Sequence, residues 1–173
     1  MKLKILGSSS KGNCYILENE SEALVIECGV KLEMVKQYLN FNIRKVVGCL
    51  LTHEHGDHAK YLSEFMKSGI NVFSSKGIHA ACGTSDNHRA YTTGDEASYN
   101  IGGFKIMPFD VKHDAAEPLG FLINHSETGN VLFLTDTYYV PYKFKNLHNI
   151  IVEANYSKEI IDKKRSQGYL PQF

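Results

Sequence analysis

The sequence lacks a net charge and any long apolar run, and each absence excludes a class of protein. Its 173 residues include 19 basic and 19 acidic residues, so the formal net charge at pH 7 is zero. A neutral chain has no overall electrostatic attraction for nucleic acid, although a local basic strip stays open. No apolar run approaches membrane-spanning length, which argues against a membrane partner. The composition, 43% hydrophobic and 22% charged, predicts one globular domain over residues 1–173.

Cysteine is scarce, and no two cysteines form a CxxC pair. The four are Cys14, Cys28, Cys49 and Cys82. Three of them lie in or beside apolar strand-like runs, which predicts buried free thiols in a reducing compartment. A cysteine metal site or a disulfide framework is the alternative. Residues 1–5 are followed at once by a polar run, so the sequence opens without a secretory signal pattern, and we expect a cytoplasmic protein.

Apolar runs of strand length alternate with amphipathic stretches of helical period. Strands are expected at residues 3–6, 14–18, 23–28, 46–51, 71–74, 121–125, 131–134 and 150–153, with a hairpin across 97–109. Helices are expected at residues 31–39, 59–67 and 76–82. Hairpins interrupted by helices indicate an α/β (α+β) fold in which helices cover layers of sheet.

Residues 52–58, which read THEHGDH, are the most informative stretch. They follow the apolar run at 46–51, which is expected to be a buried strand. His53 and His55 alternate along the chain, so in an extended segment both side chains can face one ion. Glu54 lies between them and should point away, as a surface or supporting group and not as a base. This spacing predicts a metal site at the end of a strand.

The next two polar residues of the stretch extend this site. Asp57 and His58 are adjacent, and in a turn that enters a helix both can face a second ion nearby. Histidine with carboxylate suits zinc, and also manganese or iron. Two ions roughly 3.5–4 Å apart would polarise a phosphoryl or carbonyl oxygen and hold a hydroxide between them.

Two residues elsewhere are candidates to complete the ligand set. His113 and Asp136 each follow an apolar strand-like segment, at 106–111 and 131–134. Strand ends that carry ligands build a site at one rim of a sheet. The remaining histidines lack such a setting and are interpreted as ordinary surface or core residues. They are His79, His88, His125 and His148.

The stretch at 52–58 matches the HxHxDH signature of the metallo-β-lactamase superfamily. Four further stretches, in the right order, resemble the WalJ (YycJ)-like exonuclease branch: residues 7–15, 113–121, 134–137 and 153–156. The resemblance implies an αββα sandwich with a dinuclear metal site at one edge. It also implies a metal-dependent 5′-to-3′ exonuclease that hydrolyses DNA, in preference to RNA, through a metal-bound hydroxide.

The same resemblance implies a role for each candidate residue. Two divalent ions, zinc or manganese, would be bound. Asp57 would also orient the hydroxide, which makes it the catalytic candidate. One ion would take His53, His55 and His113, and the other Asp57 and His58, with Asp136 bridging both. From the residues themselves, the loop that carries Ser9, Lys11 and Asn13 is expected to contact phosphate through backbone N–H groups and an ammonium group. A solvated loop lysine is the alternative for Lys11.

The sequence departs from the family pattern near its end. The family carries a further metal-binding histidine there, whereas residues 158–173 contain none. Tyr169 could stand in its place, but we expect that the chain stops before that segment and that the sandwich is incomplete at its C-terminal end. The second ion would then lose a ligand, and an uncovered sheet edge would favour a homo-oligomer. A small-molecule hydrolase of cyclic phosphodiesters or thioesters, and an inactive metal-binding domain, are the alternatives.

Overall fold

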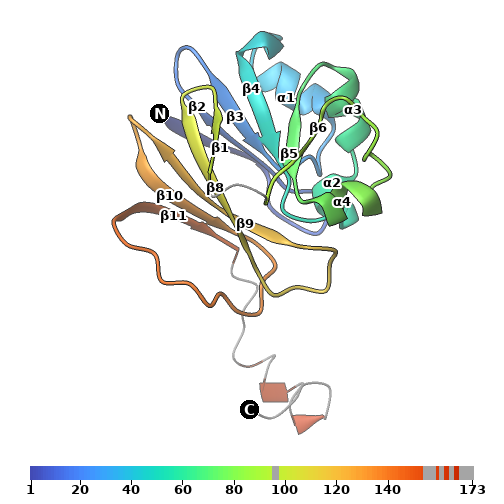
Figure 1. The fold of residues 1–173 in the computed structure, drawn as a ribbon, viewed down its shortest axis with the longest axis vertical. Helices are drawn as coiled ribbons and strands as arrows, with labels where there is room; N and C mark the ends of the chain where they lie inside the picture. Colours follow the sequence, from blue (N-terminus) through green and yellow to red (C-terminus); the bar gives the residue numbers. More distant parts are fainter. Residues whose placement is uncertain (95–97, 154–158, 160–161, 164–165, 168–173) are drawn as a thin grey trace.

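The computed structural model describes residues 1–94, 98–153, 159, 162–163 and 166–167, and two β-sheets face each other in it (Figure 1). The first sheet has the strand order β1-β2-β3-β4-β5-β6. Its first three strands are antiparallel, and the pairs from β3 to β6 are parallel. The strands are β1 (Lys2–Gly7), β2 (Cys14–Glu18), β3 (Ala23–Ile26), β4 (Val46–Leu50), β5 (Val72–Ser74) and β6 (Ala90–Thr92).

The second sheet has the strand order β11-β10-β9-β8-β7. Neighbours from β7 to β10 are antiparallel, and β11 returns parallel to β10. The strands are β7 (Tyr99–Ile101), β8 (Phe104–Asp110), β9 (Leu119–His125), β10 (Gly129–Leu134) and β11 (Leu147–Val152). All strands predicted from the apolar runs are confirmed, and β6 is an addition.

Within residues 1–94 and 98–153, four α-helices lie on the side of the first sheet that faces away from the second sheet (Figure 1). They are α1 (Leu32–Tyr38), α2 (Gly56–Ala59), α3 (Leu62–Lys67) and α4 (Lys76–Ala81), with a 3-10 turn η1 (Ile43–Lys45) before β4. The helix predicted at 59–67 is confirmed as α3, but it begins only at Leu62, and Ala59 instead ends the separate helix α2. The N–H of Tyr61 donates to the Cys28 carbonyl, which interrupts the helical hydrogen bonds.

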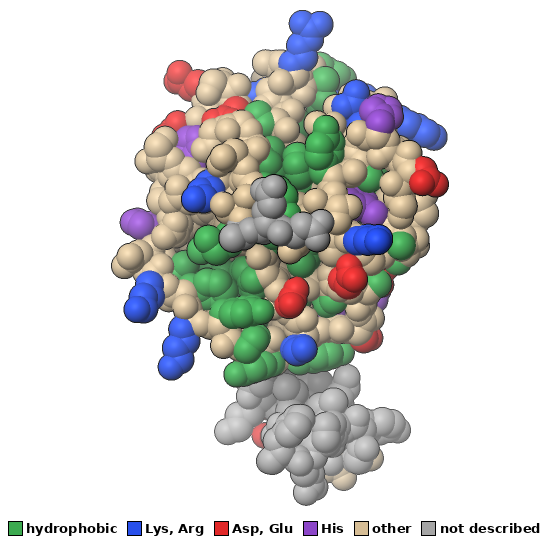
Figure 2. Space-filling model, in the orientation of Figure 1, with side chains coloured by type: hydrophobic (Ala, Val, Ile, Leu, Met, Phe, Trp, Pro, Cys, Tyr) green, Lys and Arg blue, Asp and Glu red, His purple; other side chains and the backbone are tan. Residues whose placement is uncertain are grey.

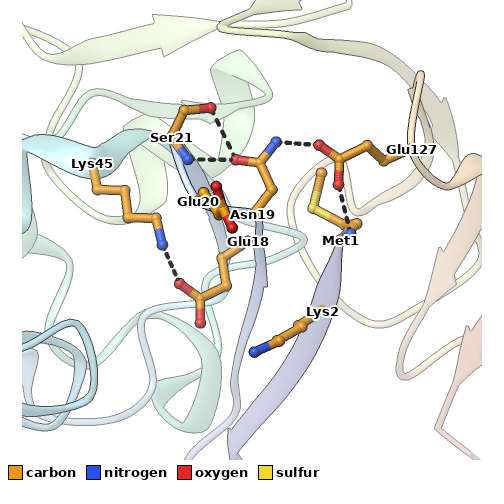
Figure 3. Close-up of a pocket in the computed structure, with 8 residues that line it drawn as sticks. All are labelled: Met1, Lys2, Glu18, Asn19, Glu20, Ser21, Lys45 and Glu127. Atoms are coloured by element: carbon orange, nitrogen blue, oxygen red, sulfur yellow. Dashed lines mark hydrogen bonds and ion pairs between the residues drawn. The ribbon is translucent and has the colours of Figure 1, made fainter.

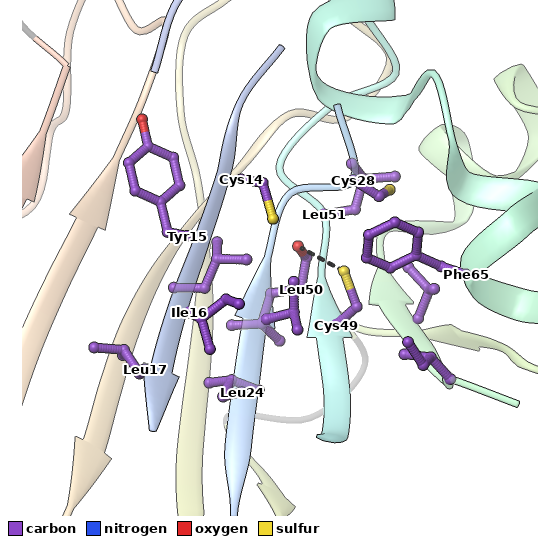
Figure 4. Close-up of a cluster of buried hydrophobic side chains, with 14 of the residues drawn as sticks. Cys14, Tyr15, Ile16, Leu17, Leu24, Cys28, Cys49, Leu50, Leu51 and Phe65 are labelled. Atoms are coloured by element: carbon purple, nitrogen blue, oxygen red, sulfur yellow. Dashed lines mark hydrogen bonds between the residues drawn. The ribbon is translucent and has the colours of Figure 1, made fainter. Parts of the chain in front are cut away.

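The hydrophobic core lies between the sheets and beneath the helices. Tyr15 of β2 meets Phe133 of β10 edge to face, with ring centroids 5.1 Å apart. Cys14, Cys28 and Cys49 are fully buried among apolar side chains (Figure 4). All four cysteines are free, which confirms the prediction of unpaired thiols.

The outer face of the second sheet is apolar and, within the described part of the chain, carries no helix. Met107, Ile150 and Val152 are exposed there. Figure 2 shows hydrophobic side chains gathered on the lower part of the molecule, with basic and acidic side chains around them. The predicted sandwich is therefore confirmed in its two sheets and in one helical layer. Residues 154–156 and Tyr169, which the sequence comparison used, lie outside the described residues.

Polar contacts join the sheets at the end where the chain begins (Figure 3). The amino group of Met1, which directly precedes β1, lies 2.6 Å from Glu127 Oε2, in the turn between β9 and β10. Asn19 Nδ2 donates to the other oxygen of Glu127 at 2.7 Å. None of the described helices has the length and apolar character needed to cross a bilayer.

Candidate metal centre

Three histidines meet where β4 and β8 end. His53 and His55 follow β4 in extended conformation, with ring centroids 4.7 Å apart. His113 follows β8, and its Nε2 lies 3.2 Å from His55 Nδ1. One ring nitrogen of each lies within 4.8 Å of the other two. The structure therefore brings together the three residues predicted for the first ion.

A second group adjoins the first and shares His53. His58 Nε2 lies 2.9 Å from Asp136 Oδ2, and His53 Nε2 lies 3.6 Å from the same oxygen. Asp136 follows β10 with a φ of +42°, a left-handed conformation that non-glycine residues seldom adopt. Such strain is concentrated at functional sites. The ligand atoms of His53, His58 and Asp136 all lie within 4.8 Å of one another.

Asp57 lies beside this second group. One of its carboxylate oxygens is 3.4 Å from His58 Nε2 and 3.3 Å from Asn13 Nδ2. The sequence placed Asp57 with His58 and Asp136, whereas in the structure His53 closes the second group. The side chains of Asp57 and Asp136 are 29% and 24% exposed, whereas that of His58 is fully buried. The two carboxylates are therefore the groups near the second ion site that solvent can reach.

Glu27, which the sequence did not predict as a site residue, contacts Thr52 and His58 on the side of the histidines that faces the protein interior. The side chain is fully buried, and Thr52 Oγ1 donates to it at 2.6 Å. Thr52 Oγ1 also lies 2.9 Å from His53 Nδ1, and Glu27 Oε1 lies 3.6 Å from His58 Nδ1. Glu27 follows β3, so the pattern of an acid at the end of an apolar strand, used for Asp136, could have found it.

The protonation of the histidines depends on these neighbours. Burial, and then the charges of His58, His113 and His55, lower the pKa of His53 to about 2, so this ring is neutral. Burial alone would lower the pKa of His58. Its contact with Glu27, followed by the charges of Asp57 and Asp136, raises that pKa to about 9. The acidic neighbours thus favour a positive charge on the ring of His58.

The donor set fits a divalent cation. His53 Nε2 is buried and makes no hydrogen bond within the described part of the chain. Because the ring is neutral, one of its nitrogens has a lone pair that can bind a metal ion. A buried polar atom without a partner is costly, and a metal ion would provide that partner. Imidazole nitrogens with carboxylate oxygens suit zinc or manganese.

Glu54 points away from the histidines, as predicted, and holds the loop that carries His113. Its Oε1 accepts a hydrogen bond from the N–H of Ala116 at 2.9 Å. In the same loop, Glu117 has a φ of +52° and accepts the N–H of Gly77, at the start of α4, at 2.6 Å. Both carboxylates therefore fasten this loop to the first sheet and its helices.

The three predicted substrate contacts lie in the loop between β1 and β2, in different settings. Asn13 is buried, and its Nδ2 lies 3.0 Å from His58 Nε2 in addition to its contact with Asp57. It therefore contacts two candidate ligands. Ser9 and Lys11 are exposed, and the backbone N–H of Lys11 donates to Ser9 Oγ at 3.3 Å. Both can contact a substrate from solvent.

The histidines interpreted as ordinary residues lie outside both groups. His79 is buried, with Nδ1 3.1 Å from Thr84 Oγ1 and Nε2 3.3 Å from the carbonyl of Tyr91. His125 Nε2 lies 3.2 Å from Glu22. His88 and His148 are exposed.

Comparison with known proteins supports the resemblance that the motifs indicated. Residues 9–74 match the family model of the metallo-β-lactamase superfamily. The chain is 27% identical to exodeoxyribonuclease YycJ of Bacillus anthracis, over 93% of this chain and 65% of that protein. It is 28% identical to exodeoxyribonuclease WalJ of Streptococcus pneumoniae, over 97% of this chain and 66% of that protein. The chain thus spans slightly less than two thirds of these relatives.

Solved structures of metallo-β-lactamases share the fold. A metallo-β-lactamase of Cronobacter sakazakii with a HARLDQ motif has a TM-score of 0.61 at 14% identity, covering 96% of this chain and 69% of that chain. The metallo-β-lactamase fold protein YhfI of Bacillus subtilis has a TM-score of 0.61 at 14% identity, over 82% and 63% of the two chains. The predicted fold and the predicted resemblance are both confirmed.

Proposed function

We propose that this chain, which has the metallo-β-lactamase fold and resembles the WalJ and YycJ exodeoxyribonucleases, is a metal-dependent phosphodiesterase that acts as an exonuclease on DNA. One observation carries the proposal. Two adjoining groups of ligand atoms come from α2 and from the segments that follow β4, β8 and β10, and within each group these atoms lie within 4.8 Å of one another. The proposal treats residues 1–173 as one domain.

The proposed cofactor is a pair of divalent ions, zinc or manganese. His53, His55 and His113 would hold one ion, and His58 and Asp136, with Asp57 beside them, would hold the other. When bound, such ions polarise a phosphoryl oxygen and lower the pKa of a water molecule. The second site has fewer nitrogen ligands than the first and should bind more weakly.

The protein's own side chains prepare and orient this chemistry. Thr52 and Glu27 fix the ring of His53, because the hydroxyl contacts both groups. Partners of this kind hold a ligand ring in its tautomer and orientation. Asp57, partly exposed at the rim, is proposed to accept a hydrogen bond from the attacking water and so to align it with phosphorus. Asn13 keeps the Asp57 carboxylate in place through its side-chain amide.

The proposed substrate is DNA, because both relatives described above are exodeoxyribonucleases. Ser9 and Lys11 lie on an exposed loop whose last residue, Asn13, contacts the site, so we propose that they contact a substrate phosphate. A cytoplasmic location is proposed on the four free thiols. Self-association is proposed on the exposed apolar edge strand β11.

The test is hydrolysis by metal-loaded protein of 5′-labelled DNA and of bis-p-nitrophenyl phosphate, with metal content measured on the same sample. We expect release of nucleotides from DNA and two ions per chain. Turnover of the small ester alone would remove the nuclease function and favour a small-molecule hydrolase. One ion or fewer, with no hydrolysis in added manganese, would identify an inactive metal-binding domain.

A further inference from the structure

The loop between β10 and β11 is rich in aromatic and basic residues. Residues 137–146 contain three tyrosines, one phenylalanine and two lysines, and no acidic residue stands between Asp136 and Glu153. The loop begins directly after Asp136, a candidate metal ligand. Its composition therefore places aromatic rings and positive charges at the edge of the metal centre.

Two of these tyrosines have side chains that are exposed to solvent. The side chains of Tyr138 and Tyr139 are 77% and 63% exposed. Their backbone is fixed, since the N–H of Tyr138 donates to the Lys112 carbonyl at 2.8 Å and that of Tyr139 to Thr137 Oγ1 at 3.3 Å. Packing does not explain large rings that a fixed backbone presents to solvent.

Tyr138 is also close to the proposed chemistry. Its ring centroid lies 6.0 Å from that of His113, and its hydroxyl contacts Asp114 Oδ1 at 3.5 Å. The same Asp114 oxygen lies 3.0 Å from His113 Nδ1, so this carboxylate lies at the hydroxyl end of Tyr138 and leaves its ring face available. A planar group stacked on Tyr138 would therefore lie next to the metal centre.

The same loop continues into a groove on the outer face of the second sheet. Phe109 of β8 packs against Phe144 and Tyr142, with ring centroids 4.8 and 5.7 Å away. These rings line a groove of about 690 Å³ together with two lysines, Lys143 and Lys145, and one acidic residue, Asp110. The aromatic surface thus extends from the metal centre along the sheet, and lysines accompany it.

We propose that Tyr138 and Tyr139 form a stacking platform for the unpaired bases of single-stranded DNA, and that Lys112, Lys143 and Lys145 bind its phosphates. Single-strand binding sites combine aromatic stacking with a positively charged track in this way. The inference rests on the proposed function, because it names the state of the DNA that this site takes. Single-stranded DNA is favoured over a protein partner because residues 137–146 combine aromatic side chains with two lysines and contain no acidic residue.

Binding can be measured without cleavage by giving metal-loaded protein a fluorescein-labelled phosphorothioate thymidine oligonucleotide. Tyr138→Ala should weaken binding about tenfold, because one stacked base is lost. Tyr138→Phe keeps the ring and should bind like the unmodified protein. Phe41→Ala is the matched control, since Phe41 is 70% exposed and follows α1 on the helical side of the first sheet.

A second measurement uses the absence of tryptophan from the sequence. Tyr138→Trp places a single fluorophore on the platform, and a base stacked on it should quench its emission. Phe41→Trp should keep its emission when the same oligonucleotide is added. A blunt duplex should quench Tyr138→Trp less than the single strand, and a ribonucleotide strand shows whether the sugar matters.

The outcomes separate this inference from the proposed function. Equal affinities of Tyr138→Ala and the unmodified protein, or unchanged Tyr138→Trp emission, would overturn the platform even if DNA is hydrolysed. Loss of binding in Tyr138→Ala with quenching in Tyr138→Trp would establish the platform even if no DNA is cleaved. Stronger quenching by the duplex than by the single strand would overturn the assignment to unpaired bases.

Discussion

Glu27 is buried with a φ of +67°, and it contacts the hydroxyl of Thr52 and the ring of His58 without facing the ligand atoms. A non-glycine residue in this conformation is uncommon and carries a free-energy cost. Residues that orient metal ligands from behind contribute strongly to metal affinity. We therefore expect Glu27 to raise the metal affinity of the site although it is not itself a candidate ligand.

Glu27→Gln should weaken metal binding roughly 10- to 100-fold, because the buried negative charge that favours a cation is removed while the shape is kept. The pKa of His58, about 9 in the metal-free protein, should fall in the same variant. Competition with a chelating dye measures the affinity. Glu18→Gln is the control, since Glu18 pairs with Lys45 far from the histidines. Equal metal affinity of Glu27→Gln and the unmodified protein would show that Glu27 serves folding alone.

His55→Ala should lose at least one bound ion and nearly all hydrolysis. His55 is a member of the first group alone, so its removal leaves two ligands there. Elemental analysis of the purified variant gives the metal content. His88→Ala removes an exposed histidine outside both groups and should keep full metal content. Near-normal metal content in His55→Ala would contradict the ligand assignment.

At the scale of elements, the loop before β2 and the start of α2 cross at Gly29. A Cβ added to Gly29 would lie 1.7 Å from the carbonyl oxygen of Asp57 and 2.6 Å from the nitrogen of Asn13. The same crossing carries hydrogen bonds, from Asn13 N to Asp57 O at 2.7 Å and from Gly29 N to Asn13 O at 3.0 Å. Only a residue without a side chain fits there, and its backbone keeps the two segments in register.

Gly29→Ala should therefore lower the melting temperature and the metal content together, because the backbone at Asp57 must move. Gly56→Ala is a close control, since a Cβ at Gly56 meets nothing within 4 Å and lies one residue from Asp57. Thermal unfolding followed by circular dichroism, with metal analysis, compares the two. If Gly29→Ala melts like Gly56→Ala, the crossing does not support the site.

The elements that the sequence predicted are those with a strong local pattern. The apolar run at 46–51 and the hairpin across 97–109 formed as expected, because their periodicity is a local property. The helix predicted at 59–67 begins only at Leu62, because the N–H of Tyr61 donates to Cys28, a tertiary contact that periodicity does not report. The three-residue strand β6 was missed for the same reason, since its register depends on β5.

For the candidate site too, the residues close together in the sequence were predicted from local spacing, whereas the distant ones were not. The histidines at 53, 55 and 58 stand in one short motif, so spacing alone placed them together. Their distances from His113 and Asp136 depend on how two sheets pack, and the resemblance to known proteins supplied that information. Glu27 was missed although it follows an apolar strand as Asp136 does, because its contacts with Thr52 and His58 appear only in the folded chain.

At the scale of the whole molecule, two edge strands expose apolar side chains. Ile150 and Val152 of β11 are 61% and 55% exposed, and Ile5 of β1 is 50% exposed. These strands are the outermost of their sheets among the described residues, and a shallow groove of about 360 Å³ lies between them. Unprotected edges of this kind favour pairing with another chain.

Ile150→Lys should reduce self-association, because a charge on an edge strand opposes pairing. Size-exclusion chromatography with light scattering gives the molar mass over a range of protein concentrations. Met34→Lys is the control, since Met34 is 41% exposed on α1. A single chain at every concentration of the unmodified protein would contradict the proposed homo-oligomer.

The two candidate ligand groups draw on both halves of the sandwich: His53, His55 and His58 lie after β4 and in α2, and His113 and Asp136 follow strands of the second sheet. The amino-terminal tie to Glu127 closes the opposite end. A bound cation would therefore link the two sheets at this edge, so that loss of metal would lower the stability of the fold as well as the activity. Proteases would then clear idle copies faster than loaded ones, and cellular abundance would follow metal supply.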